Sequence, residues 1–110
     1  MLTIASHVAE DRTILTVEGE LDLYTAPMLR ERVLATFGDG GGRLIVDLTA
    51  VPFMDSSGLG AIVSCLRRVR ESGGDLVLVT LPASAPTKLL ALTGLDQAIP
   101  TFANVDEAIG

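Results

Sequence analysis

The sequence is poor in the residues from which much covalent and metal chemistry is built. Its 110 residues include one cysteine, one histidine and no tryptophan. The single cysteine, Cys65, excludes an internal disulfide and fits a reducing compartment. Since it follows apolar residues toward the expected core side of a helix, we expect a buried and inert thiol. One histidine and one cysteine are also too few for a His/Cys metal site.

Long apolar runs and a basic excess are missing as well. No apolar segment reaches the ~20 residues of a membrane-spanning helix, and no signal-peptide pattern opens the chain. Eight basic against fourteen acidic residues leave a net charge of −6, which argues against a nucleic-acid partner. The one basic cluster, Arg67, Arg68 and Arg70, is typical of a solvated helix face. We therefore expect a cytoplasmic protein that binds neither membrane nor nucleic acid.

Motifs for catalysis and nucleotide binding are incomplete. The glycines at 38–42 precede a strand and lack the Lys-Ser/Thr pair of a phosphate-binding loop. Val63 occupies the third glycine position of a possible dinucleotide-binding turn. Ser56 has no glycine two residues before it, and His7 does not lie downstream as a hydrolase base would. We expect no enzymatic activity and no cofactor or metal ion.

Apolar and β-branched runs predict the strands, and amphipathic spacing predicts the helices. Strands are expected at 3–8, 13–17, 44–46 and 76–79, with a weak edge strand at 97–101. The short link between the first two makes them antiparallel, and alternation with helices makes the remaining sheet parallel. We expect one α/β domain over 1–110 in the order β-β-α-β-α-β-α-β-α. Its mixed, mainly parallel sheet would have about four to five strands and about four helices.

Local signals predict where the first and last helices begin and end. Thr25 is expected to cap the first helix, Pro27 to be tolerated in its first turn and Gly38 to end it. The expected buried face of this helix contains Leu29, Val33, Leu34 and Phe37. Asn104 with Glu107 is similar to a capping box for the last helix.

The segment 51–60 lies between the strand at 44–46 and an amphipathic helix. The apolar face of that helix is expected to contain Leu59, Ile62, Val63, Leu66 and Val69. Asp55, Ser56 and Ser57 lie where the helix begins, and Ser and Asp are favoured cap residues, so a plain cap is one interpretation. A hydroxyl there also lies in the positive field of unpaired N–H groups. Open α/β sheets carry functional groups at such turns.

The segment Phe53-Met54-Asp55-Ser56-Ser57-Gly58-Leu59-Gly60 resembles the signature of the STAS domain, in the branch of anti-sigma factor antagonists. Gly19-Glu20-Leu21-Asp22 with Thr25-Ala26 resembles the second marker of that family, and the similarity runs over nearly the whole chain. In that family the first serine after the aspartate is the phosphoacceptor, which here is Ser56. The resemblance implies a partner contact lined by Asp22, Thr25, Asp55, Ser57, Gly58 and Leu59.

The resemblance implies a bacterial regulator of transcription that acts by switching partners. Such antagonists bind an anti-sigma factor and thereby free a sigma factor. The anti-sigma factor is usually also a serine kinase that uses ATP and magnesium, and it releases the antagonist after phosphorylating it. A metal-dependent serine phosphatase restores the antagonist. This chain would then be a phosphoprotein without a cofactor of its own, and we expect a monomer or a weak dimer.

Other functions remain open from the sequence. A STAS domain can serve as a scaffold or stress-sensor subunit, and such domains keep the same type of turn. Residues 44–58 also resemble the middle of a receiver domain, with Asp47 as phosphoacceptor, but an acidic pair after the first strand and a later loop lysine are missing. Asp47 is instead expected to bond nearby backbone. Asp22 and Asp55 would form an acid–base pair only if their loops meet.

Overall fold

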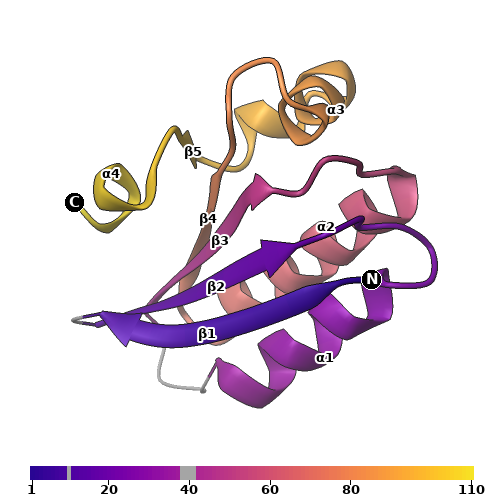
Figure 1. The fold of residues 1–110 in the computed structure, drawn as a ribbon. Coiled ribbons are helices and arrows are strands. Elements are labelled where there is room, and N and C mark those ends of the chain that lie inside the picture. The colour runs from indigo at the N-terminus through magenta and orange to yellow at the C-terminus, as the bar shows by residue number, and fades with distance from the viewer. Residues whose placement is uncertain (10, 38–41) are drawn as a thin grey trace.

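Strands and helices follow one another in the order that the sequence predicts (Figure 1). The structure is a computed structural model that describes residues 1–9, 11–37 and 42–110. The elements are β1 (Thr3–Ala9), β2 (Arg12–Glu18), α1 (Ala26–Thr36), β3 (Arg43–Ala50), α2 (Ser56–Glu71), β4 (Asp75–Val79), α3 (Ala85–Thr93), β5 (Thr101–Phe102) and α4 (Val105–Ile109). A 3₁₀ turn (Leu95–Gln97) precedes β5.

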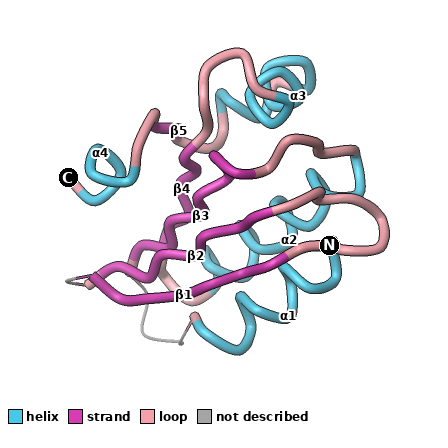
Figure 2. The backbone as a smooth tube through the Cα atoms, viewed as in Figure 1, coloured by secondary structure: helices cyan, strands magenta, loops and turns pink. Residues whose placement is uncertain are grey.

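One sheet of five strands, in the order β1-β2-β3-β4-β5, runs through the molecule (Figure 2). β1 pairs antiparallel with β2, and all other neighbours are parallel, which confirms the mixed α/β architecture. The last strand is shorter than predicted. Residues 97–100 are not a strand, because the chain is still turning there, and only 101–102 pair with β4. The carbonyl of Pro100, which has no N–H to donate, accepts from Leu78 N at 3.0 Å.

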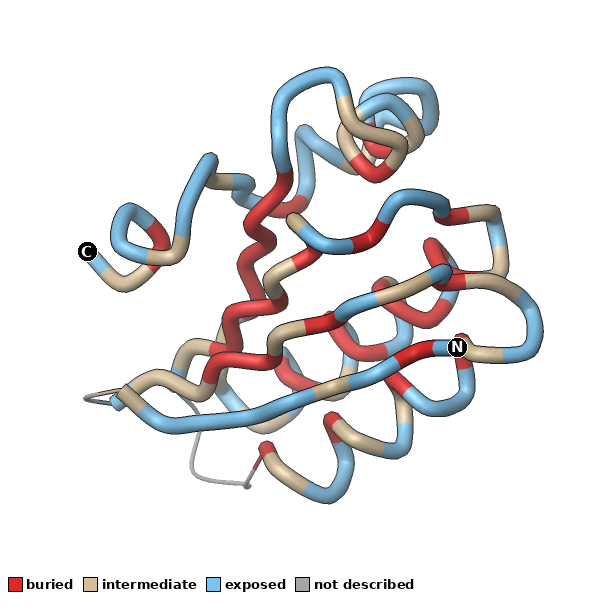
Figure 3. Tube along the Cα trace, viewed as in Figure 1, coloured by how far each residue is buried: buried red, intermediate tan, exposed pale blue. Residues whose placement is uncertain are grey.

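The core lies mainly between the sheet and the two long helices (Figures 1 and 3). β2, β3 and β4 contribute fully buried side chains to this face, and α1 and α2 cover it. These buried side chains include Leu15, Val17, Leu44, Val46, Leu76 and Leu78 from the sheet, and Leu29, Val33, Ile62, Cys65 and Leu66 from the helices. A smaller cluster on the other face places Ala108 of α4 over Ile14, Ile45, Val77 and Val79. This scaffold holds the ends of β2 and β3 in place.

Two predicted core positions lie outside the core. Leu34 is 59% exposed, because it lies about 140° around α1 from the buried Leu29. Val63 is half-buried, at the border of the apolar face of α2. The other predicted apolar positions on these two helices are buried.

Local caps mark the ends of α3 and α4, and the cap of α4 at Asn104 is the one that the sequence predicts. Ser84 accepts from Thr87 N at the start of α3, and Asn104 Oδ1 accepts from Glu107 N at 2.9 Å at the start of α4. Gly94 ends α3 in the left-handed conformation, with φ of 79°, which favours glycine. The predicted stop of α1 at Gly38 lies outside the described residues.

The arginines of α2 are only partly a solvated face. Arg67 and Arg70 are exposed, but Arg70 Nη2 donates to the carbonyl oxygen of Ala98 at 3.1 Å. Arg68 is half-buried and lines a shallow groove between α1 and α2. Two of the three arginines therefore also contact other parts of the protein or line a groove on it.

Cys65 should make the fold sensitive to alkaline pH. Its burial raises the pKa of the thiol from 9.0 to about 11, although the nearby charge of Arg30 acts in the opposite direction. The thiol ionises first in the unfolded chain, so the free energy of unfolding should fall between pH ~9 and ~11. The loss attributable to Cys65 is about 2 to 3 kcal/mol, measurable by denaturant unfolding. Cys65→Ala is the control, and an equal loss in that variant would assign the effect to other groups.

Candidate functional site

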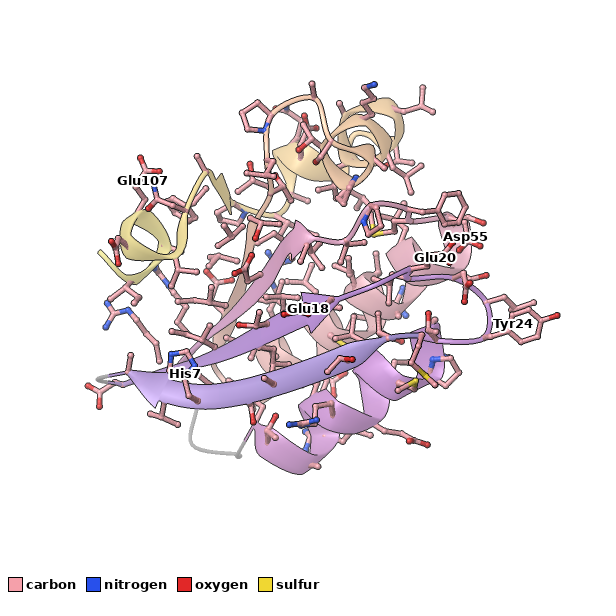
Figure 4. All side chains as sticks on the ribbon, in the orientation of Figure 1. His7, Glu18, Glu20, Tyr24, Asp55 and Glu107 are labelled. Carbon is pink, nitrogen blue, oxygen red and sulfur yellow. The ribbon has the colours of Figure 1, made fainter. Side chains whose placement is uncertain are left out.

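The two loops that carry the sequence motifs lie side by side beyond the ends of β2 and β3. Leu21 and Met54 form a parallel bridge. Leu21 N donates to the carbonyl oxygen of Phe53 at 3.0 Å, and Asp55 N donates to that of Leu21 at 3.3 Å. Figure 4 shows Glu20 and Asp55 at the same end of the molecule, from the two different loops. The meeting of these loops forms one continuous surface from two segments distant in the sequence.

Asp55 caps α2 with its side chain. Its Oδ1 accepts from Ser57 N at 2.9 Å and from Gly58 N at 3.1 Å, while its backbone is extended (φ −109°, ψ −173°). This is the geometry of an N-cap residue, and it satisfies two N–H groups that have no partner within the helix. The cap function predicted for this turn is therefore present, and it belongs to Asp55.

Ser56 is the first residue of α2 and is exposed. Ser57 is half-buried, and its backbone N–H is held by Asp55. Because Asp55 supplies the cap, the cap hydrogen bonds do not involve the hydroxyl of Ser56. That hydroxyl lies in the positive field of the helix N-terminus, which favours a negatively charged group by about 0.3–1 kcal/mol.

Asp22 and Thr25 stabilise the neighbouring loop through a small network. Asp22 Oδ1 accepts from Tyr24 N at 3.0 Å and from Thr25 N at 3.1 Å. Thr25 Oγ1 accepts from Asp22 N at 2.9 Å and lies 2.8 Å from the carbonyl oxygen of Glu20, to which it donates. The bond from Thr25 N, above all, lowers the pKa of Asp22 below its ordinary value of 3.8. Asp22 is therefore negatively charged at neutral pH, beside the loop of Asp55.

Thr25 does not cap α1 with its side chain as predicted. It stands at the N-cap position, but its hydroxyl makes no cap bond to the helix. Its Oγ1 hydrogen bonds go to the β2–α1 loop, where the Glu20 carbonyl and Asp22 N lie close to it. Pro27 lies in the first turn of α1, as predicted.

Gly58 and Leu59 lie inside the molecule rather than on its surface. Leu59 is 7% exposed and belongs to the main core. Gly58 is buried where the backbone of Leu21 approaches it, and a Cβ on Gly58 would lie 2.5 Å from the Leu21 carbonyl oxygen. Their burial holds α2 against the neighbouring loop, and the partner contact expected of these two residues stays a prediction.

Sequence reasoning missed three exposed apolar side chains around this surface. Leu23 is 65% exposed, Tyr24 86% and Phe53 47%. Figure 4 shows Tyr24 projecting from the end of the molecule where Asp55 lies. The sequence does contain a signal for these residues. They are large and apolar, yet they lie in predicted loops, where no helical or strand periodicity explains an apolar side chain. Clustered exposed apolar residues with a polar rim are typical of protein interaction surfaces.

Neither the receiver-type role of Asp47 nor a His/Cys/Asp/Glu metal site has support in the described part of the chain. Asp47 Oδ1 accepts from Thr49 N at 3.0 Å and from Thr49 Oγ1 at 2.8 Å, which confirms the predicted local bonding. Within residues 1–9, 11–37 and 42–110, no three His, Cys, Asp or Glu side chains gather as metal ligands do. Over those same residues, every helix is too short or too polar to span a bilayer.

Removing the Asp55 carboxylate should destabilise the fold. Asp55→Ala leaves Ser57 N and Gly58 N without their acceptor, and we expect a loss of about 1 to 2 kcal/mol in the free energy of unfolding. Asp55→Asn keeps a side-chain oxygen acceptor and should lose clearly less. Chemical denaturation of both variants measures the difference. Equal losses would assign the effect to the negative charge and not to the cap.

Comparison with known proteins identifies the family. The STAS domain family model matches residues 3–108. The anti-sigma-B factor antagonist of Bacillus subtilis is 35% identical over 86% of this chain and 85% of its own length. That of Listeria monocytogenes is 37% identical over 81% of this chain and 77% of its own. The crystal structure of an anti-sigma factor antagonist from Mycobacterium paratuberculosis covers 99% of this chain and 92% of that one, with a TM-score of 0.88 and 28% identity. With this fold, the paired loops and these relatives together, the chain belongs to the STAS domain family, among its anti-sigma factor antagonists.

Proposed function

We propose that this protein is a phosphorylation-controlled switch, in which unphosphorylated chain binds an anti-sigma factor with serine kinase activity and frees a sigma factor. Phosphorylation of Ser56 ends that contact, and a metal-dependent phosphatase restores it. The observation that best supports this proposal is the exposed position of Ser56, which is the first residue of α2 and directly follows the capping Asp55. The chain acts as substrate and binding partner, in keeping with a family that is generally non-catalytic.

The local geometry suits a serine that gains and loses a phosphate. The cap hydrogen bonds are made by Asp55, so modification of the Ser56 hydroxyl leaves them in place. A phosphate at the N-terminus of α2 would also be tolerated by the helix itself. The fold should therefore survive phosphorylation, and the effect would fall on the partner contact.

The docking surface would combine charge with apolar anchors. Asp22 and Asp55 present carboxylates on adjacent loops, while Leu23, Tyr24 and Phe53 offer exposed apolar area beside them. Large aromatic side chains carry much of the binding energy in many protein interfaces. An acidic rim favours a basic partner surface, which agrees with the net charge of −6.

The direct test is phosphate incorporation. Incubated with its cognate kinase and Mg-ATP, the protein should gain one phosphate, on Ser56, as a hydroxylamine-stable ester detected by mass spectrometry. Without the kinase no phosphate should appear, and Ser57→Ala should still be modified. A hydroxylamine-labile phosphate on Asp47 would contradict the proposal.

Capture of partners from host lysate distinguishes the scaffold alternative. A small ATP-binding kinase, released when ATP is added, supports the switch. A large assembly containing several STAS proteins would instead support a scaffold or stress-sensor subunit. Ser56→Ala should retain the kinase in the presence of ATP, which makes it the matched variant for this experiment.

A further inference from the structure

A shallow groove of about 140 Å³ lies between α1 and α2. The two helices cover the same face of the sheet (Figure 1). One strip of each helix lines the groove, at the three- and four-residue spacing of a single helix face. The lining residues are Arg30, Val33 and Leu34 of α1 and Ser64, Cys65 and Arg68 of α2. Ser64 lies about 12 Å along α2 from Ser56, so the groove is separate from the loops that carry the proposed switch.

The floor of the groove is apolar. Val33 and Cys65 line it although both are almost fully buried, so they form its bottom. Leu34 on the α1 wall is 59% exposed, and an apolar group that covered it would remove this surface from water. Apolar cavities of about 150 Å³ hold a molecule of the size of benzene. A groove of this volume therefore suits an alkyl chain of about six carbons.

The charged side chains that line this groove are both arginines. Arg30 stands on the α1 wall and Arg68 on the α2 wall, and each is half-buried. The positive charge of Arg30 acts on the thiol of Cys65, so the guanidinium lies near the opposite wall. A guanidinium has five N–H donors, so each arginine can hold a carboxylate oxygen and keep its contacts within the protein. An apolar floor between two guanidinium groups is complementary to a ligand with an apolar body and a negative end.

α1 and α2 form the basic part of an acidic protein. Together they contain five basic and two acidic residues, a balance of +3. The rest of the chain contains three basic and twelve acidic residues, a balance of −9. The helical layer therefore attracts an anion, whereas the charge of the remaining chain repels it.

We propose that the groove between α1 and α2 binds a small amphiphilic carboxylate, with its alkyl chain on the apolar floor and its carboxylate paired with Arg30 and Arg68. Arginine holds a carboxylate through two parallel N–H bonds, which fixes the orientation of the ligand. The groove is too small for the two chains of a membrane lipid. The ligand is therefore a free short-chain acid and not a bilayer.

Titration with heptanoate, followed by amide NMR spectra, is the first test. Its alkyl chain of about six carbons matches the groove. We expect saturable shifts at residues 30–34 and 64–68, with a dissociation constant below about 1 mM. Heptanol has the same chain without the charge and should bind at least about tenfold more weakly. Shifts that do not saturate in the millimolar range, or equal binding of the alcohol, would overturn the proposal.

Single substitutions test the two arginines. Arg30→Gln and Arg68→Gln should each raise the dissociation constant of heptanoate roughly tenfold. Arg67→Gln is the matched control, because Arg67 is exposed on the same helix and does not line the groove. It removes the same charge and should leave the binding nearly unchanged. A thermal melt confirms the fold of each variant. An equal loss in all three variants would show general attraction of anions and no site at the groove.

Vesicles of phosphatidylglycerol distinguish a free acid from an anionic membrane. The protein should stay in the supernatant when the vesicles are sedimented, because most of its charge is negative. Cosedimentation that Arg30→Gln abolishes would contradict the free acid and favour a membrane surface. None of these experiments uses the anti-sigma factor or its kinase. Failure of the groove therefore leaves the proposed function standing, and failure of the switch leaves the groove standing.

Discussion

Ser56→Asp should bind the isolated anti-sigma factor roughly 10- to 100-fold more weakly than the wild-type protein. The new carboxylate stands next to Asp55 and near the loop of the ionised Asp22. Two unit charges about 5 Å apart repel by about 3 kcal/mol at an effective dielectric of 20, and burial in an interface adds a desolvation cost. The phosphorylated protein should bind more weakly still, because a phosphate carries about −1.5 to −2 charge. Calorimetric titration against the purified partner measures all three affinities.

Two variants separate charge from shape in this experiment. Ser56→Ala removes the acceptor hydroxyl and should bind like the wild-type protein, with no further response to ATP. Ser57→Ala should still be phosphorylated and should still lose affinity after phosphorylation. A thermal melt confirms that each variant is folded. If folded Ser56→Asp and the phosphorylated protein both bind as tightly as the wild type, charge at this turn is not the switch.

Gly58→Ala should destabilise the protein by about 2 to 4 kcal/mol. An added Cβ would lie 2.5 Å from the carbonyl oxygen of Leu21 and 2.9 Å from the side chains of Leu21 and Met54. The Leu21 backbone cannot move aside freely, because its N–H and carbonyl bridge to Phe53 and Asp55. Relief of the overlap therefore requires α2 to separate from the β2–α1 loop, which would also disturb the surface around Ser56.

Gly60→Ala is the matched control for this substitution. It lies two residues further along α2, and a Cβ there would meet no atom within 4 Å. Alanine in a helix is more favourable than glycine, so Gly60→Ala should stabilise the fold by about 0.5 to 1 kcal/mol. Chemical denaturation of both variants gives the comparison. If Gly58→Ala is no less stable than Gly60→Ala, the close approach of the loops does not decide the result at Gly58.

The sequence by itself determined the features that depend on near neighbours along the chain. Apolar runs and amphipathic spacing specify the order of strands and helices, because both are patterns of near neighbours along the chain. The caps at Asp55, Ser84 and Asn104 follow in the same way, since each side-chain oxygen bonds an N–H two or three residues ahead. The motif around Ser56 was likewise readable from residue types and spacing alone.

Only the tertiary structure decided which distant groups meet. The bridge between Leu21 and Met54 joins segments more than thirty residues apart in sequence, so no local pattern contains it. A local competition was also decided only in the structure, because the Thr25 hydroxyl bonds Glu20 and Asp22 within its own loop and does not cap α1. Packing likewise buries Leu59 and leaves Tyr24 exposed. These outcomes depend on which elements lie side by side. The sheet decides this by pairing strands that whole helices separate along the chain, and helical or strand periodicity does not contain such pairings.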